Sequence, residues 1–556
     1  MGAKPRHGGA PKTRNRDDRK PSYMNVPAPD WVSFGGDETR GQDLLGLRAL
    51  VQEQGNHLFD GVTTGTPHLR YMSLICWIIW RYAQARLPEN SSSFYEFAAA
   101  QEAVFVMANR TLGRNVTRLV GVEPADKALD SKGKMLTLMR GIEHIALNDY
   151  IASSRHLKLT SQAEHGLNKL SEERGLALAK EFDKALHGTK YGAHLAKAKR
   201  ISKISREELK DLATPMSIMA IPPRERDILI HVLMPQKPMD DAERLRLRHY
   251  ALLLWLTNAK RRPVKEDDIF EAAQRPPKGL PPVLFGSTDG FLAYVVRDCL
   301  AVCHEYVFAA VMRIVDGIFQ ERNAPALSSE VAASLVADSE EKDKALRAFK
   351  LLKSGETAHT LSFRTVYDRV QTRCRKSRLE SNSIVRWQGG ISETKLYSHA
   401  ILSEDAAVSL LPVAWCLACE RAPKNRGIGI VQEEQLGTAG PFRIGIDSVI
   451  STKIEAYLEG QFSYRDVMSD LVMLTVQQHL CTVWRRFAAP NGKDTSVLIA
   501  DNDTLARNNV FKPDRTASRL PTAIDWLVQL KLISKNGLTK TGKGILDRSL
   551  KALGNP

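Results

Sequence analysis

Apolar residues recur at helical spacing along most of this chain. Residues 43–186 and 286–422 show mostly helical patterns, and helices resume after residue 450. Proline clusters at 234–241 and 274–282 interrupt the pattern and predict joints. Residues 427–450 alternate small and β-branched residues around a glycine turn, which predicts a short hairpin. The predicted fold class is mainly α: a multi-domain helical protein with small β-hairpins.

These breaks divide the chain into four predicted parts. Residues 1–24 are rich in Gly, Pro and Arg and predict a flexible basic arm. Residues 25–275 form a predicted N-terminal helical domain and residues 285–425 a central helical domain. Residues 426–556 combine the hairpin with a C-terminal domain. A chain of 556 residues is long enough for about three domains.

Two stretches of the chain share an unusual order of signals. Residues 157–182 and 530–550 each begin with Leu-Lys-Leu, which ends a helix. Each continues with a short Gly-containing hairpin, then Ser171 or Thr539, a glycine, and an amphipathic helix. This order is typical of a winged helix, with the first helix as the recognition helix and the hairpin as the wing. We therefore predict a C-terminal winged helix-turn-helix and a second winged-helix-like element near residues 97–186.

The C-terminal copy has the features of a DNA reader. Ser518 is suited to cap the recognition helix, and Pro521 falls in its first turn. Leu520, Ile524 and Leu527 share one face and are expected to pack inward, which leaves Arg519, Thr522 and Gln529 facing outward. The residues expected to contact DNA are Arg485, Arg486, Arg515, Arg519, Thr522, Lys535, Lys540 and Lys543.

The charge balance favours a polyanionic partner. The chain has 79 Lys and Arg against 63 Asp and Glu, a net charge of +16. Residues 1–24 carry a net +5 and residues 481–556 a net +7, so the 456 residues between them carry only +4. Two basic ends on a near-neutral body favour nucleic acid, because neutralising phosphates releases counterions. The alternative is that the charge serves solubility alone.

Cysteine usage and apolar run lengths bear on the compartment. The seven cysteines are an odd number and mostly lie in apolar runs, which predicts a reducing cytoplasm. The first 24 residues lack the apolar segment of a secretory signal, and no apolar run reaches the ~18 residues of a membrane span. We expect a cytoplasmic protein without a membrane partner.

A Gly-Thr turn leads into an aromatic helix at residues 58–82, LFDGVTTGTPHLRYMSLICWIIWRY. Gly61 permits a backbone turn with positive φ, and Thr63 and Thr66 can satisfy backbone groups within it. One interpretation is a rigid loop that Arg70 ties to a core helix, with Tyr71 packing inward. The other is that threonine and Arg70 line a phosphate-contacting edge at a helix N-terminus.

This stretch resembles the N-terminal signature of uncharacterised bacterial proteins from anti-phage and anti-plasmid defence islands, whose genes cluster with helicases and nucleases. The matching positions are Asp43, Gly46, Gly61, Thr63, Thr66, Arg70, Tyr71 and Trp77. The proline usual in that signature is Asp60 here, which makes the turn less rigid. The resemblance covers about 40 residues. It implies a defence context and helicase or nuclease partners, but no particular reaction.

Catalytic patterns are weak. No Gly-x-x-x-x-Gly-Lys-Ser/Thr loop occurs, and no convincing carboxylate–lysine set of a metal-dependent nuclease is seen. Cys416 and Cys419 lie in an apolar stretch, where a core helix is favoured over a zinc site. Arg297 and His304 resemble the Arg-x(n)-His motif of the all-helical HEPN ribonucleases, and Arg244 to His249 is a looser match. We expect no cofactor, no nucleotide hydrolysis and no DNA cleavage by this chain alone.

Three functions remain open at this point. The first is a non-catalytic subunit of a prokaryotic defence complex that binds nucleic acid, with double-stranded DNA favoured, and positions helicase or nuclease partners. The second is a metal-independent HEPN-like ribonuclease. The third is a scaffold whose winged helices bind only protein.

Overall fold

The computed structural model describes residues 43–113, 116–138, 145–163, 167–197, 200–274, 276–379, 403–421, 444–488, 494–513 and 519–554, together with the backbone of 38–39. Within these ranges the chain forms twenty α-helices, and its strands are at most four residues long. The prediction of a mainly-α, multi-domain helical fold is confirmed. No helix in this part of the chain is long and apolar enough to cross a membrane.

One helical body is built around α2 (Arg70–Gln84), an aromatic helix that is buried along most of its length. The helices that surround α2 or extend this body are α3 (Ser91–Leu112), α4 (Val122–Asp130), α5 (Ala146–His156), α6 (Gly175–Leu186), α7 (Lys190–Lys197) and α8 (Arg206–Leu212). Its antiparallel strand pairs are β2 (Met135–Thr137) with β5 (Lys203–Ser205), and β3 (Thr160–Gln162) with β4 (Asn168–Leu170). Local caps define helix starts: the Asn90 side chain accepts a hydrogen bond from the backbone of Ser93, which begins α3.

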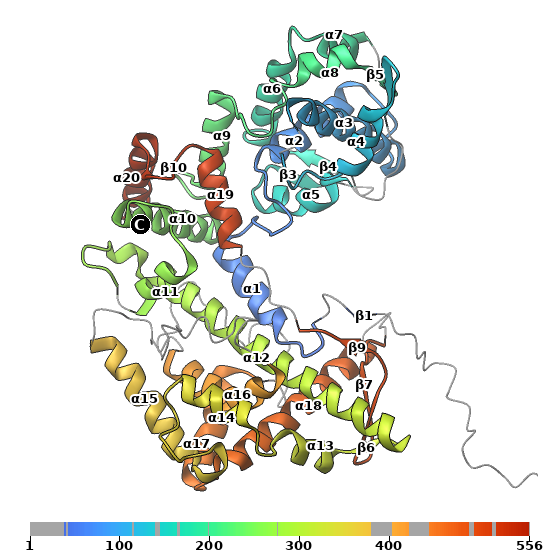
Figure 1. Cartoon of the computed structure of the whole chain (residues 1–556). Coiled ribbons are helices and arrows are strands. Elements are labelled where there is room, and N and C mark those ends of the chain that lie inside the picture. Colours follow the sequence, from blue (N-terminus) through green and yellow to red (C-terminus); the bar gives the residue numbers. More distant parts are fainter. Residues whose placement is uncertain are drawn as a thin grey trace, which may run out of the picture.

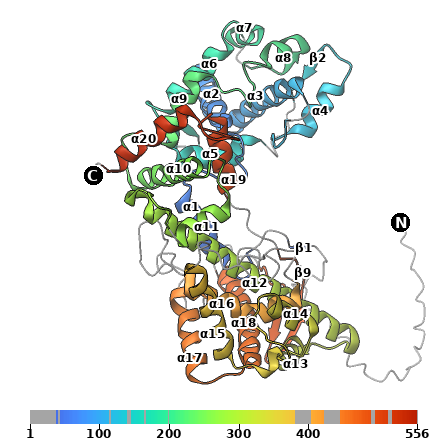
Figure 2. The same ribbon diagram turned by 60° about the vertical axis from the view of Figure 1, so that its left-hand side comes forward.

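A second group of helices lies between this body and the rest of the molecule (Figures 1 and 2). Its members are α1 (Arg48–Leu58), α9 (Pro223–Leu233), α10 (Asp241–Lys260), α11 (Glu266–Gln274), α19 (Leu520–Gln529) and α20 (Lys540–Gly554). Hairpin strands β10 (Ile533–Ser534) and β11 (Gly537–Leu538) connect α19 to α20, which packs along α10. Residues 234–240, before α10, and residues 276–281, after α11, contain no helix or strand, as the proline clusters predicted.

The lower body is organised by α12 (Phe285–Arg322), a helix of 38 residues. The helices around it are α13 (Ser328–Leu335), α14 (Glu340–Ala348), α15 (Phe363–Leu379), α16 (Glu404–Arg421), α17 (Ser451–Glu459) and α18 (Tyr464–Ala488). A three-stranded sheet has the order β6 (Ala326–Leu327), β8 (Thr504–Arg507), β7 (Leu498–Asp501), and β1 (Glu38–Thr39) pairs in parallel with β9 (Val510–Phe511).

The hairpin predicted at 427–450 falls mostly outside the described residues. Its last part is described and contains no strand, because Ile446–Ile450 form a π-helical turn that leads directly into α17. For these residues the prediction is wrong. A run of β-branched residues with one apolar face fits a short buried helix as well as a strand.

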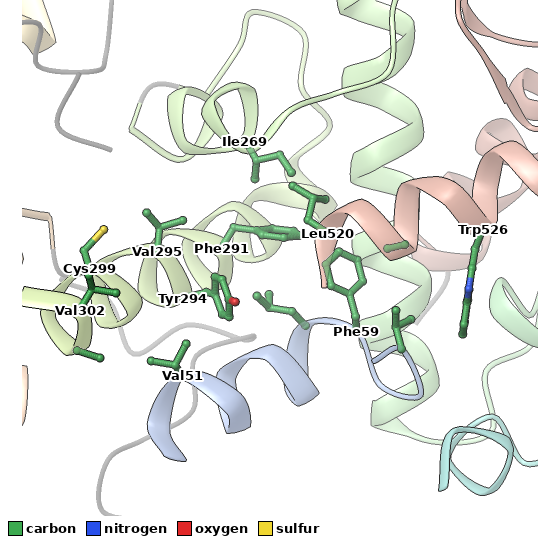
Figure 3. Close-up of a cluster of buried hydrophobic side chains, with 14 of the residues drawn as sticks. Val51, Phe59, Ile269, Phe291, Tyr294, Val295, Cys299, Val302, Leu520 and Trp526 are labelled. Carbon is green, nitrogen blue, oxygen red and sulfur yellow. The ribbon is translucent and has the colours of Figure 1, made fainter. Parts of the chain in front are cut away.

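A shared core joins the middle helices to the lower body (Figure 3). Phe59, which follows α1, packs edge-on against Phe291 of α12 with ring centroids 5.3 Å apart. Leu520 and Trp526 of α19 reach the same cluster. Helices α17 and α18 instead pack on α12, α13, α15 and α16. The segment 426–556, predicted as one C-terminal domain, therefore divides its contacts between two parts of the molecule.

Candidate nucleic-acid interface

The two copies of the repeated pattern fold into matching helix–hairpin–helix units. The first unit consists of α5, the hairpin β3–β4 and α6; the second consists of α19, the hairpin β10–β11 and α20. Two residues after the end of each first helix stands a lysine with left-handed backbone, Lys158 at φ +56° and Lys531 at φ +58°. In both units the next amide, that of Leu159 or Leu532, donates to a carbonyl five residues earlier at 2.9 Å.

The second helix of each unit also starts in the same way. The hydroxyl of Ser171 accepts a hydrogen bond from the Gly175 amide at 2.9 Å, and Thr539 does the same for Gly542 at 3.0 Å. A Cβ at either glycine would lie 2.1 Å from the carbonyl oxygen of the residue just before the first hairpin strand, Leu159 or Leu532. The internal repeat predicted from the sequence is therefore present down to its hydrogen bonds. The assignment of either unit as a winged helix stays a prediction.

The signature loop, residues 58–69, lies between the two units and bonds to both. On the side of the first unit, the Tyr150 hydroxyl accepts a hydrogen bond from the His68 amide at 3.0 Å. On the other side, Gln529 accepts from the Leu69 amide at 2.9 Å and donates to the Pro67 carbonyl at 2.8 Å. Trp526 Nε1 donates to the Thr66 carbonyl at 2.9 Å. The loop thus provides the backbone surface on which the two first helices dock.

His156 and Gln529 occupy equivalent positions, because each immediately precedes Leu-Lys-Leu. His156 Nδ1 lies 2.7 Å from a carboxylate oxygen of Asp60, and this hydrogen bond raises the pKa of His156. The other Asp60 oxygen accepts from buried Arg246 of α10 at 3.0 Å. Asp60 therefore joins the turn to α5 and α10.

Arg70 is a buried structural anchor. It is 0% exposed, and its guanidinium donates to both carboxylate oxygens of Glu225 at 3.1 Å. It also donates to the carbonyls of Pro215, at 2.7 Å, and Ser217, and it lies over the ring of Phe182. Arg70 therefore ties the start of α2 to α9 and to the segment just before α9, and none of these contacts is to the loop itself. The alternative, in which Arg70 contacts phosphate, is wrong because the guanidinium is enclosed by protein.

The remaining signature residues shape the turn. Gly61 has φ +82° and closely approaches Leu157, so a side chain there would be both strained and crowded. The Thr66 hydroxyl accepts from the Thr63 amide at 3.1 Å and donates to the Thr63 carbonyl at 3.0 Å. Tyr71 is fully buried, with its hydroxyl accepting from the Val120 amide at 3.3 Å. The contacts of Gly61, Thr63 and Thr66 shape the loop, whereas Tyr71 joins α2 to the segment before α4.

Helix α19 does not present the face that its sequence pattern predicted. Thr522 is 3% exposed, so its assignment to the outer face is wrong. Arg519 donates to the Val62 carbonyl at 2.9 Å, and partial burial lowers the pKa of its guanidinium. Gln529 is bound to the loop as described above. The polar side of α19 thus binds backbone of the signature loop, and Arg515 lies outside the described residues.

The hairpin and the start of α20 carry the exposed charge of the C-terminal unit. Lys535, Lys540 and Lys543 are exposed as predicted. Lys531 is exposed as well, and its backbone is held near the start of α20 because the Thr539 hydroxyl donates to its carbonyl. Arg261, just after α10, is also exposed, and its backbone lies so near Gly537 of the hairpin that a Cβ there would be 2.9 Å from the Arg261 carbonyl carbon. Within the described chain none of these five cations forms an ion pair. We call this set, Arg261, Lys531, Lys535, Lys540 and Lys543, the wing cations.

Sequence reasoning missed Lys531 and Arg261. Lys531 was visible in the repeated Leu-Lys-Leu, but Arg261 lies about 270 residues from the hairpin in sequence, and no local signal connects them.

The first unit lacks an equivalent surface. Lys158, the counterpart of Lys531, forms an ion pair with Asp240 and lies 3.6 Å from a carboxylate oxygen of Glu243. Exposed Glu172 and Glu173 follow the capping residue Ser171, where the second unit has Lys540 and Thr541 after Thr539. Among the described residues, the start of the second helix is therefore acidic in the first unit and basic in the C-terminal unit.

Arg485 and Arg486 are not brought to this surface. Both lie in the last turn of α18, in the lower body, while α20 lies beside α10 (Figure 1). Arg486 donates to the Asp43 carbonyl, which anchors the chain just before α1. Their contact with DNA stays a prediction, but they would belong to a separate region.

The histidine of the HEPN-like pattern is enclosed in the lower body. His304 is 0% exposed; Trp415 Nε1 donates to its Nε2 at 2.9 Å, and its Nδ1 lies 2.8 Å from the Thr475 hydroxyl. Because indole can only donate, the ring proton of neutral His304 resides on Nδ1. Burial lowers the pKa of His304 to about 3. His249, of the looser match, is likewise 0% exposed. Neither ring can reach an RNA substrate while the helices stay packed, which argues against the ribonuclease interpretation.

The Cys-x-x-Cys pair belongs to a core helix, as its apolar sequence indicated. Cys416 is fully buried in α16, and burial raises the pKa of its thiol well above the usual value. Among the described residues no group of His, Cys, Asp and Glu side chains is arranged to hold a metal ion.

Comparison of the chain with protein-family models, with curated proteins and with solved structures finds no match.

Proposed function

We propose that this chain is a non-catalytic DNA-binding subunit of a multi-protein prokaryotic anti-phage or anti-plasmid defence complex, and that it positions helicase or nuclease partners on duplex DNA. The observation that supports DNA binding is the set of wing cations, which are exposed and have no acidic partner among the described residues. The defence context rests on the resemblance of the signature around Gly61 to Tyr71.

The wing cations suit phosphates better than bases. Lysine is a flexible point charge, whereas base readout favours side chains with fixed, paired donors. In α19, the first helix of the unit, Arg519 and Gln529 bond to the signature loop and Thr522 is buried. None of these three residues, which were predicted to face outward, is available to enter a DNA groove. The proposed contact is therefore electrostatic, with weak sequence preference and strong dependence on salt.

The salt dependence can be given a magnitude. Each neutralised phosphate contributes about 0.9 to the slope of log affinity against log salt. If all five wing cations contact phosphates, raising the salt from 50 to 200 mM should weaken binding by roughly 500-fold. Fluorescence anisotropy with a labelled 20-bp duplex measures this slope directly.

A charge-reversal variant tests the location of the site. Lys535→Glu/Lys540→Glu/Lys543→Glu should weaken binding at 100 mM salt by roughly 500-fold or more, and lower the slope by about three. The matched control reverses three exposed lysines around α4 and β2: Lys127, Lys132 and Lys134. It makes the same change in net charge, so a local site predicts a much smaller loss for the control. Circular dichroism confirms that both variants are folded.

Three results would overturn the proposal. Wild-type protein that does not bind DNA at 50 mM salt would remove it. Equal losses in the two triple variants would show that only net charge matters. If the wing variant kept its DNA affinity but lost a partner subunit in a pull-down from the native host, the C-terminal unit would be a protein-binding scaffold.

A further inference from the structure

A pocket separates α9 from α20, the second helix of the C-terminal unit. Both helices pack on α10, and they lie next to each other in both views (Figures 1 and 2). The volume of the pocket is about 360 Å³. Sites for small molecules have volumes of about 300–1,000 Å³, so this pocket suits a small ligand. Every residue that lines it lies within the described ranges.

The floor of the pocket is apolar. On the side of α9, Ile230 and Met234 are four residues apart and are 6% and 4% exposed. On the side of α20, Ile545 is 6% exposed. Thr541, Ile545 and Arg548 recur at helical spacing, so one face of α20 is turned toward α9. A floor of this kind suits a flat or apolar group better than a bare ion.

The rim of the pocket carries polar side chains of both signs. Asp227 and His231 lie one turn apart on α9, and Arg548 lies opposite them on α20. Gln236 and Thr541 add an amide and a hydroxyl. All five side chains are exposed, and none of them forms a hydrogen bond or an ion pair within the described part of the chain. Asp227 and Arg548 thus line the same pocket without neutralising each other.

This combination fits a nucleotide better than a phosphate ion. The carboxylate of Asp227 repels phosphate, but it can accept a hydrogen bond from the exocyclic amino group of a base, such as N4 of cytosine. The guanidinium of Arg548 matches two phosphate oxygens. The flat faces of a base suit the floor formed by Ile230 and Ile545, and histidine rings such as that of His231 stack on bases. One nucleotide therefore satisfies the floor and both charges of the rim.

The pocket is adjacent to the wing cations. Thr541, at its rim, directly follows Lys540 in the first turn of α20, and Lys543 lies two residues further on. A strand whose phosphates these lysines hold therefore has its next nucleotides close to the pocket. A base inside a duplex is paired and stacked, so only an unpaired base can enter a pocket in the protein.

We propose that the pocket between α9 and α20 binds one unpaired nucleotide of DNA, next to the duplex held by the wing cations. Asp227 accepts from the amino group of cytosine or adenine, and Arg548 contacts the phosphate. The proposal rests on the proposed function and names the substrate class of the same surface: a duplex that ends in a single strand or opens into one. Such a junction is also where a helicase partner would separate the strands.

The test compares duplexes that differ only in the bases of a single-stranded tail. A 20-bp duplex carries a tail of five cytosines or of five thymines, so the number of phosphates is the same. Thymine has an oxygen where cytosine has the amino group. Wild-type protein should bind the cytosine tail at least about fivefold more tightly than the thymine tail at 100 mM salt. Fluorescence anisotropy with labelled DNA measures this ratio.

Two variants test the acid and the space separately. Asp227→Ala removes the acceptor, and Thr541→Trp places a large uncharged side chain at the pocket rim; both positions are exposed. Each variant should bind the two tails with affinities within about twofold of each other, and should bind a blunt 20-bp duplex almost as wild type does. The matched control, Asp547→Ala, removes an exposed acid of α20 that does not line the pocket, and should keep the preference for cytosine. Circular dichroism confirms that the variants are folded.

The outcomes separate the pocket from the wing site. If wild-type protein binds the blunt duplex but binds both tails equally, the pocket proposal is refuted while the proposed function stands. A preference that survives in either pocket variant, or that Asp547→Ala also abolishes, refutes it as well. If wild-type protein binds no DNA at 50 mM salt, the proposed function fails and this proposal fails with it. Pocket variants that keep the preference but lose a partner subunit in a pull-down would assign the pocket to protein.

Discussion

Gln529 offers a direct test of how the C-terminal unit is held in place. Its side chain lies at the end of α19 and bonds to two neighbouring backbone groups of the signature loop, the Leu69 amide and the Pro67 carbonyl. Both loop residues are buried. The substitution Gln529→Met keeps the length and approximate volume of the side chain but removes both its donor and its acceptor.

The expected cost follows from the two groups left behind. A buried amide without a partner costs roughly 1–3 kcal/mol, and a lost hydrogen bond to the carbonyl roughly 1 kcal/mol. Together they should destabilise the docking of α19 by roughly 2–4 kcal/mol. Since 1.36 kcal/mol corresponds to a factor of ten, the open state of this unit should become at least ~30-fold more populated.

Hydrogen exchange measured by mass spectrometry reports this local opening. Peptides from α19 and α20 should exchange at least ~30-fold faster in Gln529→Met, while peptides from α12 and α16 in the lower body should keep their wild-type rates. The matched control is Val528→Ala, at the neighbouring position, where the side chain is 43% exposed and contacts less of the protein. Exchange in α19 within twofold of wild type would refute the docking role of Gln529.

Two further predictions concern single residues. Gly542→Ala should lower the thermal midpoint through an overpacking cost of roughly 1–3 kcal/mol, because its Cβ would meet the Leu532 carbonyl. Gly544→Ala is the control: nothing lies within 4 Å of its Cβ, so the higher helix propensity of alanine should raise the midpoint, by up to ~1 kcal/mol in stability. Equal changes in midpoint for the two variants would contradict the close approach at Gly542. His304 has its pKa lowered to about 3, below the ~6.5 of an unfolded chain, so the unfolded state takes up its proton first. The stabilising effect of neutral His304 is full above about pH 6.5 and is lost as the pH falls toward 3. The difference in unfolding free energy between wild type and His304→Gln, measured by urea unfolding, should therefore shrink by roughly 1 kcal/mol between pH 6 and pH 5. A difference that stays constant over this range would contradict the burial argument.

Local chemistry determined the parts of this protein that the sequence predicted well. The repeated pattern around Leu157–Leu159 and Leu530–Leu532 predicted two helix–hairpin–helix units, because each signal acts within a few residues. A capping hydroxyl satisfies an amide one turn away, and a glycine removes the Cβ that would collide with the carbonyl just before the first hairpin strand. The aromatic helix α2 followed from its composition, which is too apolar for a surface.

The sequence also predicted a tight turn in the signature loop, but it left two interpretations of Arg70 open. Glycine and threonine at fixed spacing imply a tight turn wherever it lies. Whether Arg70 binds phosphate or protein could not be derived, because the answer depends on Glu225 and on two carbonyls that lie about 150 residues away in sequence.

The faces of α19 show what only the tertiary structure decided. Its amphipathic pattern separates apolar from polar residues, and this separation is correct for Leu520 and Leu527. The pattern cannot show whether the polar residues meet water or another backbone. The loop that receives Gln529 lies 460 residues earlier, so this face is satisfied by hydrogen bonds that no local window contains.

Charge is the clearest example of the same division. The sequence determined that Lys158 and Lys531 follow their helices in the same conformation, and both lysines carry the same charge. The tertiary structure places Asp240 beside Lys158, whereas no acid of the described ranges forms an ion pair with Lys531. Coulomb interactions depend on distance in space rather than on separation along the chain, so only the folded arrangement decides which cation remains available to a partner.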